Sequence, residues 1–187
     1  MCGIVAYIGN KNAFSRLIKG LSRLEYRGYD SAGIALIDKE LTVFKKLGKV
    51  KDLVNYIGGT QLSGTIGIGH TRWATHGIPN DVNAHPHTSG NGKISLVHNG
   101  IIENYQAIKT DLELRGYTFK SDTDTEVVVC LIEDIQKNSK LHIGDAVRVA
   151  LSKIVGAYAI VVLSADQPDR LIAARRVGSR LSGSSTV

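Results

Sequence analysis

The apolar residues of this 187-residue chain follow two spacings in turn, and the order of those spacings limits the fold. Alternating or continuous apolar runs predict strands at 4–8, 33–38, 41–46, 65–70, 94–98, 157–164 and 170–174. Helical spacing of apolar residues predicts helices at 14–24, 50–57, 102–115, 124–137 and 144–153. Because strands and helices come in blocks, the chain is expected to form an α+β fold with layered antiparallel sheets, rather than a doubly wound parallel sheet.

One long stretch, residues 71–92, shows neither spacing. It contains Pro79, Pro86 and several Gly, Asn and Ser residues, so it is predicted to be irregular. Irregular segments of that length inside a domain usually serve a function.

Composition excludes several classes of protein. Hydrophobic residues make up 43% and charged residues 21% of a chain long enough for one domain, which is typical of a globular protein. No apolar run reaches the ~18 residues of a membrane span, and no signal peptide opens the sequence, so we expect a cytoplasmic protein without a membrane partner. The net charge of +6 comes from scattered basic residues without a nucleic-acid-binding motif. A solvated basic face therefore explains this charge better than nucleic-acid binding.

The chain has two cysteines, Cys2 and Cys130, which lie far apart and without CxxC spacing. Neither a disulfide framework nor a cysteine zinc site is indicated, and Cys130 is expected to be core. Cys2 follows the initiator Met1, and removal of Met1 would leave a thiol and a free α-amine on one residue. An amine that titrates near ~7.7–8.0 can take the thiol proton, as in hydrolases with an N-terminal nucleophile. The alternative is that Cys2 is a small apolar residue opening the strand at 4–8.

Five histidines gather in and beside the irregular stretch, which raises a metal hypothesis. They are His70, His76, His85, His87 and His98. Their spacing lacks the tight pattern of catalytic zinc sites such as HExxH, so histidines hydrogen-bonded in a polar cleft are the preferred interpretation and no metal is predicted.

Six motifs follow one another along the chain and become specific when taken together. They are CGIV at 2–5, LEYRGYDSAG at 24–33, GHTRWATHG at 69–77, NAHPH at 83–87, HNGIIEN at 98–104, and GYTF at 116–119 with TDTE at 123–126. This ordered set closely resembles the glutaminase domain of the glutamine:fructose-6-phosphate amidotransferase family, a class II glutamine amidotransferase. Amidophosphoribosyltransferases and asparagine synthetases share the N-terminal cysteine and an Arg-Gly-x-Asp element, but Tyr29 and the WATH run at 73–76 favour the hexosamine family.

The resemblance implies a catalytic mechanism. Cys2 would attack the side-chain carboxamide of L-glutamine, release ammonia and form a γ-glutamyl thioester, with its own α-amine carrying the protons. The side chain of Asn99 and the backbone N–H of Gly100 would stabilise the oxyanion. Arg27, within the Arg-Gly-x-Asp element, would support the nucleophile strand, although that element also resembles a plain turn. No cofactor is implied.

The resemblance also implies a glutamine pocket. Arg72 would bind the α-carboxylate, Asp124 would bind the α-ammonium, and Thr75 and His76 would complete the carboxylate end. Trp73 would belong to a segment that gates ammonia passage, although a tryptophan is more often core or rim packing.

Each residue of this pocket also has an ordinary structural interpretation. Arg72 and Asp124 would then be a surface ion pair. Asn99-Gly100 is a common turn dipeptide, which predicts a hairpin loop after the strand at 94–98. Asp124 or Thr123 would cap the helix that begins near 125.

The family fold is a four-layer α-β-β-α sandwich of the N-terminal nucleophile hydrolase type, and the end of the chain departs from it. We expect a glutaminase domain at 1–175 that lacks its last strands, followed by a divergent flexible tail at 176–187. Such an exposed sheet edge could let the chain associate with itself. In the family, a sugar-isomerising domain in the same chain uses the ammonia to make D-glucosamine 6-phosphate from D-fructose 6-phosphate. The alternatives are a catalytically silent fragment, the glutaminase domain of another class II amidotransferase, or a metal-dependent hydrolase.

Overall fold

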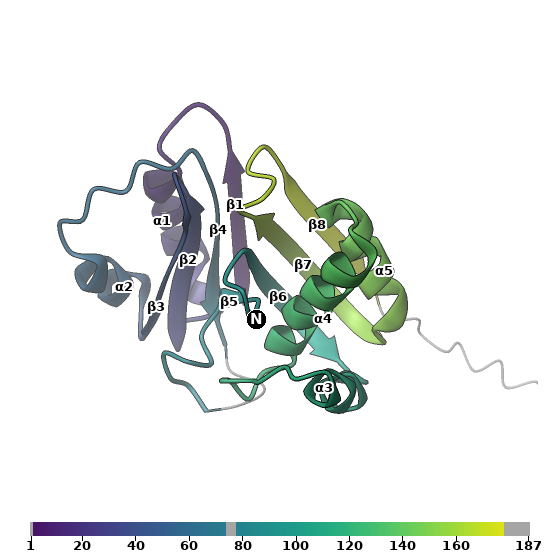
Figure 1. The fold of residues 1–187 in the computed structure, drawn as a ribbon. Coiled ribbons are helices and arrows are strands. Elements are labelled where there is room, and N and C mark those ends of the chain that lie inside the picture. Colours follow the sequence, from purple (N-terminus) through teal and green to yellow (C-terminus); the bar gives the residue numbers. More distant parts are fainter. Residues whose placement is uncertain (1, 74–77, 178–187) are drawn as a thin grey trace, which may run out of the picture.

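The computed structural model of the chain describes residues 2–73 and 78–177, which form four layers (Figure 1). Two antiparallel sheets of four strands lie face to face, with helices on the outer face of each. The predicted α+β class and the α-β-β-α sandwich are therefore confirmed.

The first sheet carries the N-terminal half of the chain. Its strands are β1 (Gly3–Ile8), β2 (Ser31–Ile37), β3 (Leu41–Leu47) and β4 (Ile66–Arg72), in the order β1-β4-β2-β3. Helices α1 (Ala13–Leu24) and α2 (Val50–Ile57) cover its outer face. Helix α1 begins where it does because the side chain of Asn12 accepts the N–H of Ser15, which satisfies one of the free donors of the first turn.

The second sheet carries the C-terminal half. Its strands are β5 (His87–Thr88), β6 (Ile94–Ile102), β7 (Gly156–Ser164) and β8 (Leu171–Arg176), in chain order. Helices α3 (Tyr105–Leu114), α4 (Asp124–Ser139) and α5 (Ile143–Lys153) cover its outer face.

Apolar side chains fill three separate layers. One cluster lies between the first sheet and α1 and α2, and a larger one lies between the second sheet and its helices. Between the two sheets, aliphatic side chains such as Ile68, Val97 and Val161 make contact. The cleft described below lies at the edge of this middle layer, where β1, β4 and β6 approach one another.

Most predicted elements are present, and the differences concern their ends. Strand β6 runs on to Ile102, so Asn99 and Gly100 are strand residues and the predicted hairpin loop at this dipeptide is wrong. The helix predicted from 102 begins at Tyr105 for the same reason. Two short elements were not predicted, the strand β5 and the 3-10 turn η1 (Glu25–Arg27) after α1.

None of the helices in residues 2–73 and 78–177 combines the length and the apolar character needed to cross a membrane. Most of the segment predicted to be a tail, from residue 178 onward, lies outside the described residues.

Candidate active site

The register between β1 and β4 determines where Cys2 lies. Gly3 pairs with Thr71, so Cys2 comes next to the last residues of β4. There the backbone N–H of Trp73 donates to Cys2 Sγ at 3.2 Å, and Sγ lies 3.5 Å from the carbonyl oxygen of Trp73. A Cβ on Gly3 would approach Leu24 Cβ and Thr71 Oγ1 to 2.8 Å, so this strand needs a glycine beside the cysteine. Cys2 is thereby fixed at the end of the sheet and stays partly exposed.

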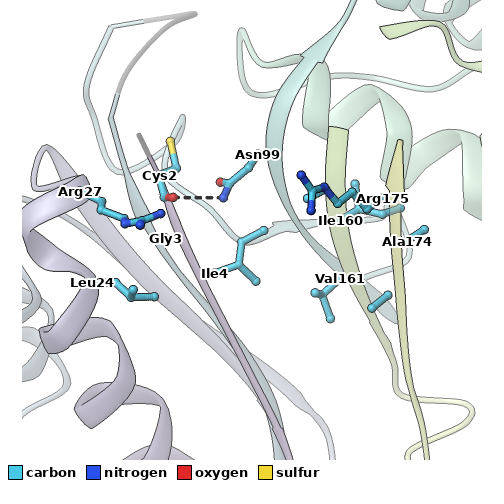
Figure 2. Close-up of a pocket in the computed structure, with 12 residues that line it drawn as sticks. Cys2, Gly3, Ile4, Leu24, Arg27, Asn99, Ile160, Val161, Ala174 and Arg175 are labelled. Atoms are coloured by element: carbon cyan, nitrogen blue, oxygen red, sulfur yellow. Dashed lines mark hydrogen bonds between the residues drawn. The ribbon is translucent and has the colours of Figure 1, made fainter. Parts of the chain in front are cut away.

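The second sheet brings Asn99 to the same point. Figure 2 shows its side chain pointing from β6 toward Cys2, and its Nδ2 donates to the carbonyl oxygen of Cys2 at 3.1 Å. Gly100 follows with a φ of +130°, and a Cβ there would lie 2.1 Å from the carbonyl oxygen of Ala157 on β7. Glycine is the residue that fits this backbone shape.

Asp124 and Arg72 both line the cleft, and both are buried, with 7% and 4% of their surface exposed. The surface ion pair proposed as an alternative is therefore wrong. Asp124 is the first residue of α4, and its Oδ2 accepts the backbone N–H of Ile102 at 2.8 Å. The helix cap is Thr123, whose Oγ1 accepts the N–H of Glu126, so capping does not explain Asp124.

A cavity of about 670 Å³ joins these groups. The residues predicted for the site that line it are Cys2, Arg27, Arg72, Trp73, Asn99, Gly100 and Asp124. A second cavity of about 490 Å³ adjoins it at Cys2 and runs between β1 and the strands β7 and β8 (Figure 2). Cys2 thus lies where the two cavities meet.

Arg27 and Trp73 lie at the opening of the cleft. Trp73 is 47% exposed, and its ring meets the ring of Tyr29 edge to face at 5.3 Å between centroids. Rim packing therefore describes Trp73, and the core interpretation is wrong. Arg27 is exposed at the end of η1, lines both cavities, and donates through Nε to the hydroxyl of Tyr26 at 2.8 Å.

Within the lining of the cleft, buried polar side chains form a network around Thr125. His85 Nε2 and His98 Nδ1 lie 2.9 and 3.0 Å from Thr125 Oγ1, and this hydroxyl also lies 3.3 Å from Asp124 Oδ1. His98 Nδ1 lies 3.7 Å from the same carboxylate oxygen. The network ties the carboxylate of Asp124 to the strand that carries Asn99.

Three histidines of this region are kept neutral by burial. Burial lowers the pKa of His70 to about 4 and lowers the pKa of His85 and His87 well below the ordinary value. The ring of His85 stacks on His70 at 4.3 Å and meets His87 edge to face at 4.9 Å. Neutral imidazoles can bind metals, but no three His, Cys, Asp or Glu side chains within residues 2–73 and 78–177 are arranged to hold one.

Two predicted pocket residues, Thr75 and His76, lie outside the described residues. Conversely, the cavity is lined by residues that the sequence did not single out for the site, notably Thr125, Ile101 and Arg175. Thr125 could have been found from the sequence, because it is a polar residue at the start of the apolar face of α4. Burial of its hydroxyl is unfavourable unless the hydroxyl has hydrogen-bond partners.

Comparison with known proteins relates this geometry to one family. Residues 57–180 match the family described as "Glutamine amidotransferase domain". The chain is 55% identical over 178 residues to a glutamine–fructose-6-phosphate aminotransferase (isomerizing) of Bacteroides thetaiotaomicron and 54% identical over 177 residues to that of Pyrococcus horikoshii. Each alignment covers 94% of this chain and 29% of the relative, so the chain spans less than a third of the length of these relatives.

A solved structure has the same fold over nearly the whole chain. Glutamine phosphoribosylpyrophosphate amidotransferase from B. subtilis, in complex with ADP and GMP, superposes with a TM-score of 0.78 at 29% identity. The match covers 94% of this chain and 37% of that one.

Proposed function

The chain belongs to the glutamine amidotransferase domain family, and from this premise we propose that it hydrolyses L-glutamine to glutamate and ammonia with Cys2 as the nucleophile. The observation that supports the proposal most strongly is that one cavity is lined by a cysteine, an asparagine, a buried arginine and a buried carboxylate. A substrate with an amide at one end and a zwitterionic amino-acid group at the other needs this set of groups.

In the first step, the thiolate of Cys2 attacks the carboxamide carbon of glutamine. The α-amine of Cys2, free once Met1 is removed, takes the thiol proton and delivers a proton to the leaving ammonia. Water then hydrolyses the thioester to glutamate. The N–H of Trp73, 3.2 Å from Sγ, supports the sulfur in its negatively charged form.

Negative charge also develops on the carbonyl oxygen of the substrate. We propose that the side chain of Asn99 and the backbone N–H of Gly100 stabilise this charge. Asn99 Nδ2 has two N–H groups, and one of them bonds the carbonyl oxygen of Cys2 at 3.1 Å. The other is available for an oxyanion formed on the Cys2 side of the cavity. Losing one such donor typically costs about 3 kcal/mol of barrier.

For the amino-acid group of the substrate, we propose that Arg72 binds the α-carboxylate and Asp124 the α-ammonium. Both side chains are buried, so their interactions with a bound ion are screened less than at the surface. Thr75 and His76 would add to the carboxylate end, and Trp73 would gate the opening from which ammonia leaves.

The two relatives described above are named for a reaction with fructose 6-phosphate, and this chain matches less than a third of each. We propose that the ammonia is delivered to a sugar-isomerising domain, which uses it to make D-glucosamine 6-phosphate in the cytoplasm. Self-association of the chain through a sheet edge belongs to the same proposal, and size-exclusion chromatography with light scattering tests it.

The test is glutamine hydrolysis by the purified chain, followed as glutamate release. We expect turnover that a chelator does not change, and loss of turnover in Cys2→Ser with an unchanged melting temperature. Full activity in Cys2→Ser would contradict the mechanism, and inhibition by the chelator would support a metal-dependent hydrolase. No turnover by the folded wild-type chain would support the catalytically silent alternative.

A further inference from the structure

The carboxamide of Asn99 is held from both ends. Its Nδ2 donates to the carbonyl oxygen of Cys2 at 3.1 Å, and its Oδ1 lies 2.8 Å from Nε2 of His70. An asparagine amide can turn by 180°, which exchanges its oxygen and its NH2 group. Which of the two faces the nucleophile decides whether this side chain can donate a hydrogen bond there at all.

A backbone carbonyl resolves the orientation. His70 Nε2 also lies 3.1 Å from the carbonyl oxygen of His98, and a carbonyl oxygen only accepts. Nε2 must therefore carry a hydrogen, because an unprotonated nitrogen would face this oxygen lone pair to lone pair. With a hydrogen on Nε2, Asn99 must present its oxygen to His70, and its NH2 group then points toward Cys2.

We infer that His70 is a positioning residue for the proposed glutaminase reaction: its Nε2–H holds the oxygen of Asn99 and so directs the NH2 group of this side chain at the Cys2 side of the cavity. The inference rests on the proposed function and adds to it a residue that does not line the cavity.

The surroundings of His70 keep the imidazole in place and uncharged. The residue is 1% exposed on β4, and its ring stacks on His85 with 29° between the ring planes. Burial lowers the pKa of His70 to about 4, so the neutral ring persists throughout the neutral pH range. In the neutral imidazole one nitrogen donates and the other accepts, so the contact with the His98 carbonyl selects a single tautomer.

The first experiment compares two substitutions at His70 in the full chain. His70→Leu removes the Nε2–H donor and introduces an apolar side chain of similar bulk. His70→Gln places an amide N–H near the position of Nε2. We expect His70→Leu to lower kcat for glutamine about 100-fold with KM changed less than about threefold, because only transition-state stabilisation is lost. His70→Gln should recover kcat to within about tenfold of the wild type.

His87→Leu is the matched control. His87 is equally buried, but its Nε2 contacts Thr123 rather than Asn99. We expect this variant to lose stability like His70→Leu while keeping kcat within about threefold. Because His70 acts through Asn99, the double variant His70→Leu/Asn99→Ala should be no slower than Asn99→Ala alone.

Nuclear magnetic resonance of the wild-type chain gives a readout that needs no activity. A long-range ¹H–¹⁵N correlation of the imidazole distinguishes the two neutral tautomers, and we expect the Nε2–H form for His70. A Nδ1–H form would overturn the inference, as would a kcat of His70→Leu within threefold of the wild type or an equal loss in His87→Leu. If the wild-type chain hydrolyses no glutamine, the proposed function fails, while the tautomer still decides whether His70 holds Asn99.

Discussion

The mouth of the cleft and its floor are built in different ways. At the mouth, Cys2, Arg27, Trp73 and Gly100 are exposed or partly exposed, and backbone groups of Trp73 hold the thiol of Cys2. The Sγ atom of Cys2 contacts the N–H and the carbonyl oxygen of Trp73, so the side chain of Trp73 takes no part in holding it.

The floor depends on side chains that bond one another. His70, His85, His98, Asp124 and Thr125 are buried at 7% exposure or less, and four of them are linked through the hydroxyl of Thr125. A reacting group must be reachable, whereas a group that orients a substrate benefits from exclusion of water. Substitutions at the mouth should therefore change activity with little effect on folding, and changes of charge in the floor should affect folding as well.

The largest effect is expected at the mouth, in Cys2→Ala. Without the thiol no thioester can form, so glutamine turnover should fall by about 10³-fold or more. Because the side chain is small and partly exposed, the free energy of unfolding should change by less than about 1 kcal/mol. Steady-state kinetics and urea unfolding of the same preparation check both expectations, and a large loss of stability would break the distinction between mouth and floor.

Acid should lower the free energy of unfolding through the buried histidines of the floor. The pKa of His70 is about 4 in the folded chain against an ordinary value of 6.5, so between these values the unfolded chain binds the proton and the folded chain does not. The contribution of His70 is therefore complete above pH 6.5 and is lost as pH falls to about 4, a change of roughly 3 kcal/mol. The lowered pKa values of His85 and His87 act in the same direction.

Urea unfolding at a series of pH values between 7.5 and 4.5 measures this change. The control is His70→Gln, in which the part of the change that comes from His70 should be absent. A free energy of unfolding that stays constant over this range would show that the buried histidines do not resist protonation.

Asp124→Asn tests whether this floor residue binds the α-ammonium of glutamine, as proposed. The amide oxygen of the new side chain can still accept the N–H of Ile102, so the helix should keep its place, while the negative charge that would attract an α-ammonium is lost. We expect KM for glutamine to rise about 10- to 100-fold with kcat changed less than about threefold, as for a charge-assisted hydrogen bond made in both ground and transition states. An unchanged KM would remove Asp124 from the glutamine pocket.

The smallest effect is expected for Cys130→Ala. Cys130 is buried on α4, and burial raises the pKa of its thiol to about 12, so it should not react with electrophiles at neutral pH. Activity should stay within about twofold of the wild type and stability should fall by about 1 kcal/mol. Loss of glutamine turnover in this variant would show that Cys130, and not Cys2 alone, is needed for activity.

The mouth was easier to predict from the sequence than the floor. Cys2 and Arg27 of the Arg-Gly-x-Asp element are visible in linear order. The strand and helix spacings predict an α+β fold with layered antiparallel sheets, whereas the four layers were implied by the resemblance to the family. The contact between His70 and Asn99 joins residues 29 positions apart, so no local spacing reveals it. It depends on β4 of one sheet packing near β6 of the other, which is a property of the assembled fold.

The errors have a similar origin. Asn99-Gly100 has the composition of a turn, but pairing with Ala159 and Tyr158 on β7 keeps both residues in the strand. Tertiary pairing overrides the local preference of the dipeptide. Of the two helix caps that the sequence allowed, Thr123 performs this role, which leaves the carboxylate of Asp124 to Ile102 and the cleft.

The most direct test of the central claim is the intact mass of the purified chain before and after exposure to a glutamine-like diazoketone, an electrophile that alkylates a competent glutaminase nucleophile. We predict a starting mass without Met1 and a single adduct that free glutamine suppresses and that Cys2→Ser abolishes. A chain that lacks Met1 and gains no adduct, or an adduct carried by Cys130, would contradict the account.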